Sequence, residues 1–264
     1  MPSLTLDTPE LAETYDVVSD KQFDHGKLLL EALRIRPGER VLDIGCGTGR
    51  LGEFVASTLV GPQGEVVGID PLPHRIAIAR KRASANHRPE VGVSDNLSAF
   101  AASSFDVAYL NSVYHWLPEK LPTLREARRV LKKGGRLGIS VASRERPHDL
   151  HILLREVLAE QGLVAEGGGH TPHQVTAGQL AQQLEEGGFL VDELRVRVFT
   201  DLFPDVAAVL AFNTSSSFGN FLSGYPPEAR TRALAAFTSA LERRRTPAGI
   251  QLQRRLLFSV ATAA

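Results

Sequence analysis

Short apolar runs recur along the first half of the chain, and stretches with helical spacing separate most of them. Apolar runs of this length that end at glycine, proline or polar residues are typical of buried strands. Five strands are expected, over residues 41–44, 66–70, 91–93, 105–110 and 136–141. The pattern predicts a βαβαβαβαβ succession, and therefore a doubly wound α/β fold with a parallel sheet and right-handed crossovers.

The segments on either side of this alternation predict further helices and two closing strands. Helices are expected over residues 10–34 (two short ones), 118–131, 149–161, 176–187 and within 205–245. Alternating apolar residues predict strands over 191–203 and 256–261. We expect a single domain over residues 1–264, with a ligand-binding core at about 35–142 and closing strands at about 190–203 and 255–262. A helical cap is expected from about 1–30, 145–175 and 204–250.

Composition and charge narrow the classes of partner. The 264 residues are 43% hydrophobic and 23% charged, which suffices for a large α/β core. The formal net charge is zero, so neither a nucleic acid nor an anionic membrane is expected as partner. One cysteine excludes an internal disulfide, and the first 16 residues lack the pattern of a signal peptide. We therefore expect a cytoplasmic protein that does not span a membrane, while its oligomeric state does not follow from the sequence.

The most informative stretch is residues 41–49, VLDIGCGTG, in which a strand runs directly into three alternating glycines. Glycine tolerates positive φ and lets the backbone approach a ligand without an intervening Cβ. Residues 50–56 have helical spacing, so N–H groups at the start of that helix would point at whatever the loop holds. The sequence predicts a ligand-binding loop after the first strand.

Two kinds of cofactor use such a loop. Read from Gly47, the glycines match the G-x-G-x-x-G dinucleotide pattern through Gly52, which would indicate an NAD-dependent oxidoreductase. That pattern should start where the strand ends, and counted from Gly45 it fails at Arg50. Asp43, inside the strand, would repel a pyrophosphate and suits a cationic amine. The residues favour a cationic cofactor over a dinucleotide.

The stretch VLDIGCGTG resembles motif I of class I S-adenosylmethionine (SAM) methyltransferases. The turn Lys132-Lys133-Gly134-Gly135 looks like the L-K-P-G-G turn of the same family, with Lys133 in place of proline. The resemblance implies a Rossmann-like sheet of seven mostly parallel strands with helical cap insertions. It also implies S-adenosyl-L-methionine as the cofactor and S-adenosylhomocysteine as the product.

The resemblance also implies the cofactor contacts. Asp43 would lie near the methionine end of SAM, and the glycines would lie under the cofactor. Asp70 ends the second strand about 20 residues after the last glycine, where a carboxylate can accept both ribose hydroxyls. Pro71 and Leu72 would border the adenine, and Asp95 with the following backbone N–H would bind it. The complete expected set is Asp43, Gly45, Cys46, Gly47, Gly49, Asp70, Pro71, Leu72, Asp95, Asn96 and Asn111.

Residues 111–118 follow the fourth strand, where ligands bind in such sheets. Asn111-x-x-Tyr114 lacks both prolines of the Asn-Pro-Pro-Tyr motif, so the turn that this motif forms is not expected. The His115-Trp116 pair is similar to the carboxyl methyltransferases that include trans-aconitate methyltransferase. In that branch a Trp indole N–H and a Gln of the N-terminal helix hold the substrate carboxylate, which implies Trp116 and Gln22. Core packing of Trp116 and a structural hydrogen bond at His115 are the alternatives.

The chemistry of methyl transfer limits the roles of these residues. The reaction is an in-line displacement in which alignment supplies most of the acceleration. A carboxylate needs no base, whereas a phenol, amine or carbon acid does, and His115 is the candidate for a base or orienting group. We expect a small-molecule acceptor that reacts at a carboxylate oxygen, or else N- or C-methylation of a natural-product or quinone-like acceptor. An NAD-dependent oxidoreductase and a noncatalytic SAM-binding module are the alternatives from other classes.

Two histidine pairs have a spacing found among metal ligands, His148 with His151 and His170 with His173. No carboxylate or cysteine pattern completes a site around either pair. We therefore expect no metal.

Overall fold

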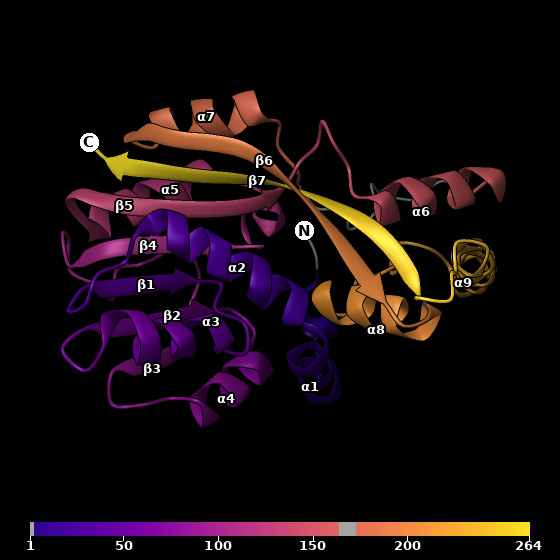
Figure 1. Ribbon diagram of the computed structural model, residues 1–264, viewed down its shortest axis with the longest axis horizontal. Helices are drawn as coiled ribbons and strands as arrows, with labels where there is room; N and C mark the ends of the chain where they lie inside the picture. The colour runs from indigo at the N-terminus through magenta and orange to yellow at the C-terminus, as the bar shows by residue number, and fades with distance from the viewer. Residues whose placement is uncertain (1–2, 164–172) are drawn as a thin grey trace.

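The computed structural model describes residues 3–163 and 173–264, which form a seven-stranded sheet in the order β3-β2-β1-β4-β5-β7-β6 (Figure 1). Strands β1 to β5 run parallel, and β7 runs antiparallel to both of its neighbours. This confirms the doubly wound, mostly parallel, Rossmann-like sheet with helical insertions. The strands are β1 Arg40–Ile44, β2 Glu65–Asp70, β3 His87–Val91, β4 Phe105–Asn111, β5 Leu131–Ala142, β6 Phe189–Phe203 and β7 Ile250–Ala263.

Helices lie on both faces of the sheet (Figure 1). They are α1 Pro9–Val18, α2 Asp20–Leu33, α3 Arg50–Phe54, α4 Pro73–Lys81, α5 Leu121–Val130, α6 Asp149–Glu160, α7 Ala177–Glu186, α8 Val206–Ser216 and α9 Pro227–Glu242, with short helical turns at Leu4–Leu6, Val55–Val60 and Tyr114–Trp116. Successive strand residues point to opposite faces. Val41 accordingly packs with α2 and α3, whereas Leu42 packs in the core that contains α5 and α7. None of the described helices has the length and apolar composition that a bilayer span requires.

Strands β6 and β7 extend beyond the other strands and carry a second hydrophobic core. They pair along their whole length, but β5 pairs only with residues 256–262 of β7. The remaining ends form a two-stranded ribbon that leads to α6, α8 and α9 (Figure 1). We call the buried residues there the outer cluster, which consists of Leu150, Leu153, Val157, Phe203, Val206, Val209, Phe212, Phe237, Ala240, Leu241, Ile250 and Leu252.

The third strand and the connection after it differ from the sequence prediction. Strand β3 spans His87–Val91, whereas the apolar pattern predicts residues 91–93. As the edge strand it has only one strand neighbour and carries polar residues, so it lacks an apolar signature. Residues 92–104, all of them described, contain no helix, so the strand–helix alternation is interrupted there. Leu97 and Phe100 reach the core from this loop instead.

Candidate active site

A cavity of about 1090 Å³ lies at the carboxyl ends of the parallel strands and continues to the outer cluster. Its walls come from α2, from the loops after β1, β2 and β4, and from α6, α8 and the ribbon. A smaller adjoining pocket contains Asp43 and Cys46. Together they bring most of the sequence-predicted site residues to one place. The large cavity is lined by Gln22, Gly45, Gly47, Asp70, Pro71, Leu72, Asp95, Asn111, His115 and Trp116.

The glycines of the loop adopt backbone conformations that other residues rarely adopt. Gly45, Gly47 and Gly49 have φ values of 78°, 55° and 79°. A Cβ at Gly45 would overlap the Val113 side chain, and one at Gly49 would crowd helix α4. At Gly47 the nearest atom would belong to the Tyr15 ring, 3.4 Å away. Gly47 therefore faces the cavity, while the other two allow close packing behind the loop.

Asp70, at the end of β2, is held by the backbone of the loop. Its Oδ2 accepts a hydrogen bond from the Gly47 N–H and its Oδ1 from the Leu72 N–H, each at 2.9 Å. Burial raises the pKa of Asp70, and the nearby Arg75 charge opposes this. Each carboxylate oxygen can accept a further hydrogen bond. The side chain thus fits its predicted contact with two ribose hydroxyls.

Two buried oxygen atoms at the predicted methionine end have no hydrogen-bond partner among the described residues. They are Asp43 Oδ2 and Gln22 Oε1, and both residues line the smaller pocket. Burial raises the pKa of Asp43 to about 7, although the adjacent Tyr109 phenol works against this. Buried acceptors without a donor are costly. An ammonium group would satisfy both oxygens, so these residues and the glycine loop fit the amino acid end of SAM.

Asn111 has both ends of its side-chain amide engaged. Its Nδ2 donates to the Gln22 carbonyl oxygen at 3.1 Å, and its Oδ1 accepts from Ser140 Oγ at 2.6 Å. These bonds hold α2 against the ends of β4 and β5. Asn111 lines both pockets, but in the described structure its polar atoms position α2, and a direct cofactor contact stays a prediction.

Cys46 and Asn96 are placed differently from the other predicted residues. The Cys46 side chain is buried against Gly68 of β2, on the wall of the smaller pocket. Asn96 is exposed, and its backbone N–H donates to the Val93 carbonyl at 3.5 Å. Its neighbour Asp95 lines the large cavity. The adenine contact predicted for Asn96 would have to replace this hydrogen bond.

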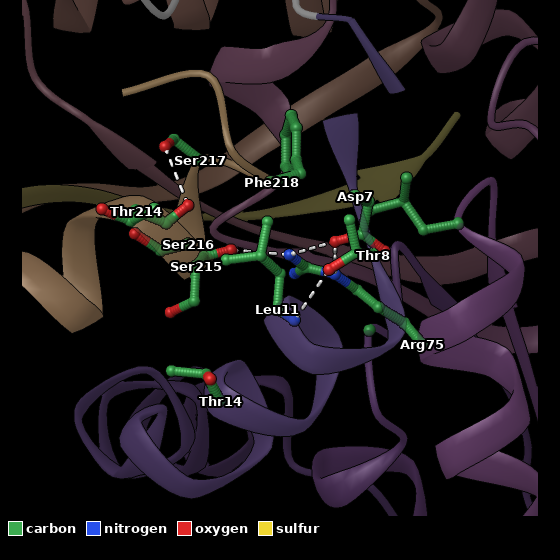
Figure 2. Close-up of polar contacts among 12 residues, drawn as sticks. Asp7, Thr8, Leu11, Thr14, Arg75, Thr214, Ser215, Ser216, Ser217 and Phe218 are labelled. Atoms are coloured by element: carbon green, nitrogen blue, oxygen red, sulfur yellow. Dashed lines mark hydrogen bonds and ion pairs between the residues drawn. The ribbon is translucent and has the colours of Figure 1, made fainter. Parts of the chain in front are cut away.

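A buried arginine joins the N-terminal segment, α4 and α8 beside the cofactor end of the cavity. Arg75 donates to Asp7 Oδ1 at 3.3 Å and to the Ser215 carbonyl oxygen at 2.7 Å (Figure 2). Its guanidinium lies 4.2 Å from the centroid of the Tyr15 ring. Arg75 is 4% exposed, so this contact is largely shielded from solvent. It connects the helices that border the cofactor end.

His115 and Trp116 lie on the cavity wall in the turn after β4. Their ring centroids are 5.0 Å apart, and Trp116 packs edge-to-face on Phe218 at 4.7 Å. His115 Nδ1 is buried without a partner among the described residues. Burial, with a smaller effect from the Lys120 charge, lowers the pKa of His115 to about 3. His115 is therefore neutral at physiological pH.

The cavity wall also contains histidines that sequence analysis considered only as metal ligands. His148 and His151 lie near the start of α6 with ring centroids 5.2 Å apart. His148 Nδ1 accepts a hydrogen bond from the Arg255 N–H at 2.9 Å. Burial lowers the pKa of His148 well below its usual value and that of His151 to about 4. Both line the cavity in their neutral form.

An ion pair on the ribbon is the part of the wall that sequence analysis missed entirely. Arg254 of β7 donates from Nε to Asp201 Oδ2 of β6 at 2.8 Å, and both residues line the cavity. The sequence does contain a sign of this ion pair, because each charged residue lies two positions from an apolar residue that points inward, Phe203 on β6 and Leu252 on β7. That pattern acquires meaning only when the pairing of the two strands is known.

Residues 3–163 and 173–264 contain no group of three or more His, Cys, Asp or Glu side chains arranged to hold a metal ion. Of the second histidine pair, His173 is described, whereas His170 lies outside the described residues.

Comparison with known proteins gives a family and several relatives. The family model described as "Methyltransferase domain" matches residues 35–188. Trans-aconitate 2-methyltransferase of Rhodopseudomonas palustris is 26% identical over 240 residues, covering 86% of this chain and 88% of that protein. Arsenite methyltransferase of Halobacterium salinarum is 39% identical over 108 residues, covering 39% of this chain and 27% of that protein.

Two further comparisons differ in how much they cover. An uncharacterized 37.1 kDa protein in a Streptomyces fradiae transposon is 36% identical over 121 residues, which span 45% of this chain but 34% of that protein. The solved structure of a putative methyltransferase from Bacillus halodurans has a TM-score of 0.61 at 18% identity. It covers 90% of this chain and 97% of that one, so the two share a fold.

The family match settles the choice between the two kinds of cofactor. It covers more than half of the chain and includes the glycine loop, β2 and the turn with His115 and Trp116. It favours SAM over the dinucleotide and an enzyme over a noncatalytic module. The chain belongs to the class I S-adenosylmethionine-dependent methyltransferases.

Proposed function

We propose that this methyltransferase transfers a methyl group to a carboxylate oxygen of a small-molecule acceptor that binds against Trp116. The observation that carries the proposal is the absence of an effective base among the described histidines of the cavity wall. His115, His148 and His151 all have lowered pKa values. A base with a pKa of about 3 cannot efficiently deprotonate a phenol, an amine or a carbon acid. A carboxylate is already ionised and needs no such base.

Trp116 is suited to hold that carboxylate. No described residue accepts a hydrogen bond from its indole N–H, and the ring is fixed between His115 and Phe218. A neutral donor orients a carboxylate without binding its charge as tightly as a cation would. The acceptor oxygen therefore keeps more of its nucleophilicity.

The cofactor end supplies binding and alignment. When bound, SAM provides an electrophilic methyl group on a positively charged sulfur. Asp43 and the Gln22 amide oxygen would bind its ammonium group, Gly47 would support it, and Asp70 would bind the ribose. Apolar side chains form much of the cavity wall and would displace water around a bound acceptor. Because sulfonium and carboxylate charges are neutralised during the reaction, a dry environment disfavours the separated ions more than the transition state.

Other acceptors have less support. Cys46 is the only cysteine of the chain and is buried, so no set of thiols is available to hold arsenite. The match to the Rhodopseudomonas relative, which is named for a carboxylic acid, covers 86% of this chain, whereas the match to the arsenite relative covers 39%.

The proposal can be tested with radiolabelled SAM and a panel of small carboxylic acids. Methyl esters release methanol on alkaline hydrolysis, whereas N- and C-methyl products do not, so the readout identifies the acceptor atom. Trp116→Phe should lower kcat/KM for the acid about 10- to 100-fold, the loss expected for one hydrogen bond to a charged group. Its affinity for SAM should not change. Alkali-stable methylation, or an unaffected kcat/KM in this variant, would contradict the proposal.

Gln22 needs a separate test because it lines both pockets. The resemblance assigns it to the acceptor carboxylate, but the fully buried, unpartnered atom of its amide is Oε1, which suits the cofactor's amino group. Gln22→Ala should therefore raise the Kd for SAM with little change in the KM of the acid. The opposite result would return Gln22 to the acceptor.

A further inference from the structure

Arg254 is a cavity-lining cation that the proposed function leaves without a role. Arg144 and Arg155 also line the cavity, but both are exposed, whereas Arg254 is half-buried. It lies on β7 diagonally across from Asp201 on β6, since Asp201 is paired with Leu252 and Arg254 with Phe199. Its Nε donates to Asp201 Oδ2 at 2.8 Å, and its side chain is 17% exposed. Of the described residues, only Asp201 accepts a hydrogen bond from this guanidinium. The Nη1 and Nη2 groups are therefore available to a ligand.

The surroundings fix the orientation of the Arg254 side chain. The guanidinium lies over the Phe212 ring at 4.8 Å from its centroid. Asp201 is 5% exposed and is also approached by His25 Nε2 of α2 at 3.6 Å. His25 in turn stacks on Phe199 at 3.8 Å. Asp201 thus holds the Nε edge of the guanidinium, and Phe212 covers one of its faces. The edge with the Nη groups therefore points in a fixed direction, which suits a planar anion.

The charge of Arg254 extends across the acceptor side of the cavity. It contributes to the lowered pKa values of His25, His115, His148 and His151. These residues come from α2, from the turn after β4 and from α6, so Arg254 lies among all three elements. Its partner Asp201 is the one buried carboxylate among the described residues that contacts it. The site thus contains one arginine, held in place by Asp201 and Phe212, among uncharged histidine side chains.

We propose that Arg254 binds a second carboxylate of the acceptor, one that is not methylated. A guanidinium on the reacting carboxylate would stabilise the ground state most, because that carboxylate loses its charge in the reaction, and would slow the transfer. On a carboxylate that keeps its charge the same contact aids binding and alignment at no such cost. Because Asp201 already balances part of the charge, one singly charged carboxylate suits the site better than a phosphate dianion.

This inference rests on the proposed function, and it makes the acceptor a dicarboxylic acid. The reacting group lies at Trp116 and the other at Arg254. Arg254 then determines specificity, since a monocarboxylic acid would leave its Nη groups without an anion inside the cavity.

The binding test uses the intrinsic fluorescence of Trp116, which is the only tryptophan of the chain. The protein is saturated with S-adenosylhomocysteine and titrated with straight-chain dicarboxylic acids of four to eight carbons, their monoamides and monocarboxylic acids of equal length. At least one dicarboxylic acid should bind the wild-type protein at least about tenfold more tightly than its monoamide. Equal affinities throughout the series would overturn the proposal without any variant.

Variants then identify the residue. Arg254→Gln should reduce the affinity for the dicarboxylic acid to that for the monoamide while leaving the affinity for S-adenosylhomocysteine unchanged. Arg254→Lys should retain part of the discrimination. The matched control is Arg195→Gln on β6, since Arg195 is an exposed residue outside the cavity lining. An unchanged preference for the dicarboxylic acid in Arg254→Gln would overturn the proposal.

Failure of this inference is distinguishable from failure of the proposed function. If both the wild type and Arg254→Gln methylate monocarboxylic acids at oxygen as efficiently as dicarboxylic acids, only the proposed role of Arg254 is contradicted. If no acid yields an alkali-labile methyl group, the proposed function falls, and Arg254 loses its assignment with it.

Discussion

The cofactor end and the acceptor end of the cavity are built from different ranges of the chain. At the cofactor end, Asp43, Gly47 and Asp70 come from β1, the loop after it and β2, within 28 residues of one another. At the acceptor end, His115, His148 and Arg254 come from three separate elements and are brought together by the ribbon and by α6. The first end can be recognised as a motif, whereas the second exists only in the folded protein.

The two ends also differ in their electrostatics. The cofactor end has buried oxygens without donors, and burial raises the pKa of Asp43 and Asp70. The acceptor end has neutral histidines, because burial lowers their pKa values, and it has Arg254, which Asp201 holds in place. One end therefore favours a cation and the other an anion, as expected for a sulfonium donor and a carboxylate acceptor.

The largest effect that separates the ends is expected for Asp70. Asp70→Ala removes two predicted hydrogen bonds to the ribose and two observed ones to the loop. Because hydrogen bonds to charged groups contribute about 1.5–3 kcal/mol each, the Kd for SAM should rise about 100-fold or more. Trp116→Ala should change it less than about threefold. Isothermal titration calorimetry measures both, and equal effects would remove the distinction between a cofactor and an acceptor end.

A somewhat smaller effect is expected for the Arg75 contact, which connects the helices that border the cofactor end. Arg75→Lys retains the charge beside Asp7 but loses the bond to the Ser215 carbonyl and the stacking on Tyr15. The free energy of unfolding should fall by about 2 kcal/mol, as measured by urea denaturation. The exposed Arg195→Lys serves as the control. If both variants unfold at the same urea concentration, the Arg75 contact does not stabilise the fold.

The pH dependence of cofactor binding should report on Asp43. Its pKa of about 7 means that the carboxyl group is half protonated near neutrality and must ionise to bind an ammonium group. Below pH 7 the Kd for SAM should therefore rise, by up to about tenfold per pH unit, and above pH 7 it should level off. In Asp43→Asn binding should be weaker and independent of pH over this range. A flat wild-type profile between pH 5.5 and 8 would show that Asp43 is not the group that binds the amine.

The smallest effect is expected from the neutral histidines at the acceptor end. The pKa of His115 is about 3 in the folded protein and near 6.5 when unfolded. Above pH 6.5 it is neutral in both states, whereas below pH 6.5 the unfolded state binds a proton that the folded state does not. Between pH 7.5 and 5.5 the wild type should lose about 1 kcal/mol more stability than His115→Gln. Parallel pH profiles in urea denaturation would exclude this contribution.

The wrong sequence predictions share one cause. The apolar pattern predicts a strand at residues 91–93 and an uninterrupted strand–helix alternation, but β3 is an edge strand with a polar sequence. Leu97 and Phe100 are buried from a loop that has no periodicity. The spacing of apolar residues shows which positions of a regular element face the core. It therefore does not predict an edge strand that borders solvent, or core residues that come from a loop.

The sequence by itself determined the parallel sheet, the glycine loop and the family, because each depends on residues close together in the chain. Apolar runs define buried strands, and only glycine adopts the φ values of Gly45, Gly47 and Gly49 without strain. The tertiary structure decided which oxygens of Asp43 and Gln22 lack a partner, how far burial shifts the histidine pKa values, and that Arg254 meets Asp201. Burial and electrostatic environment are properties of the assembled surroundings, which residues distant in sequence supply.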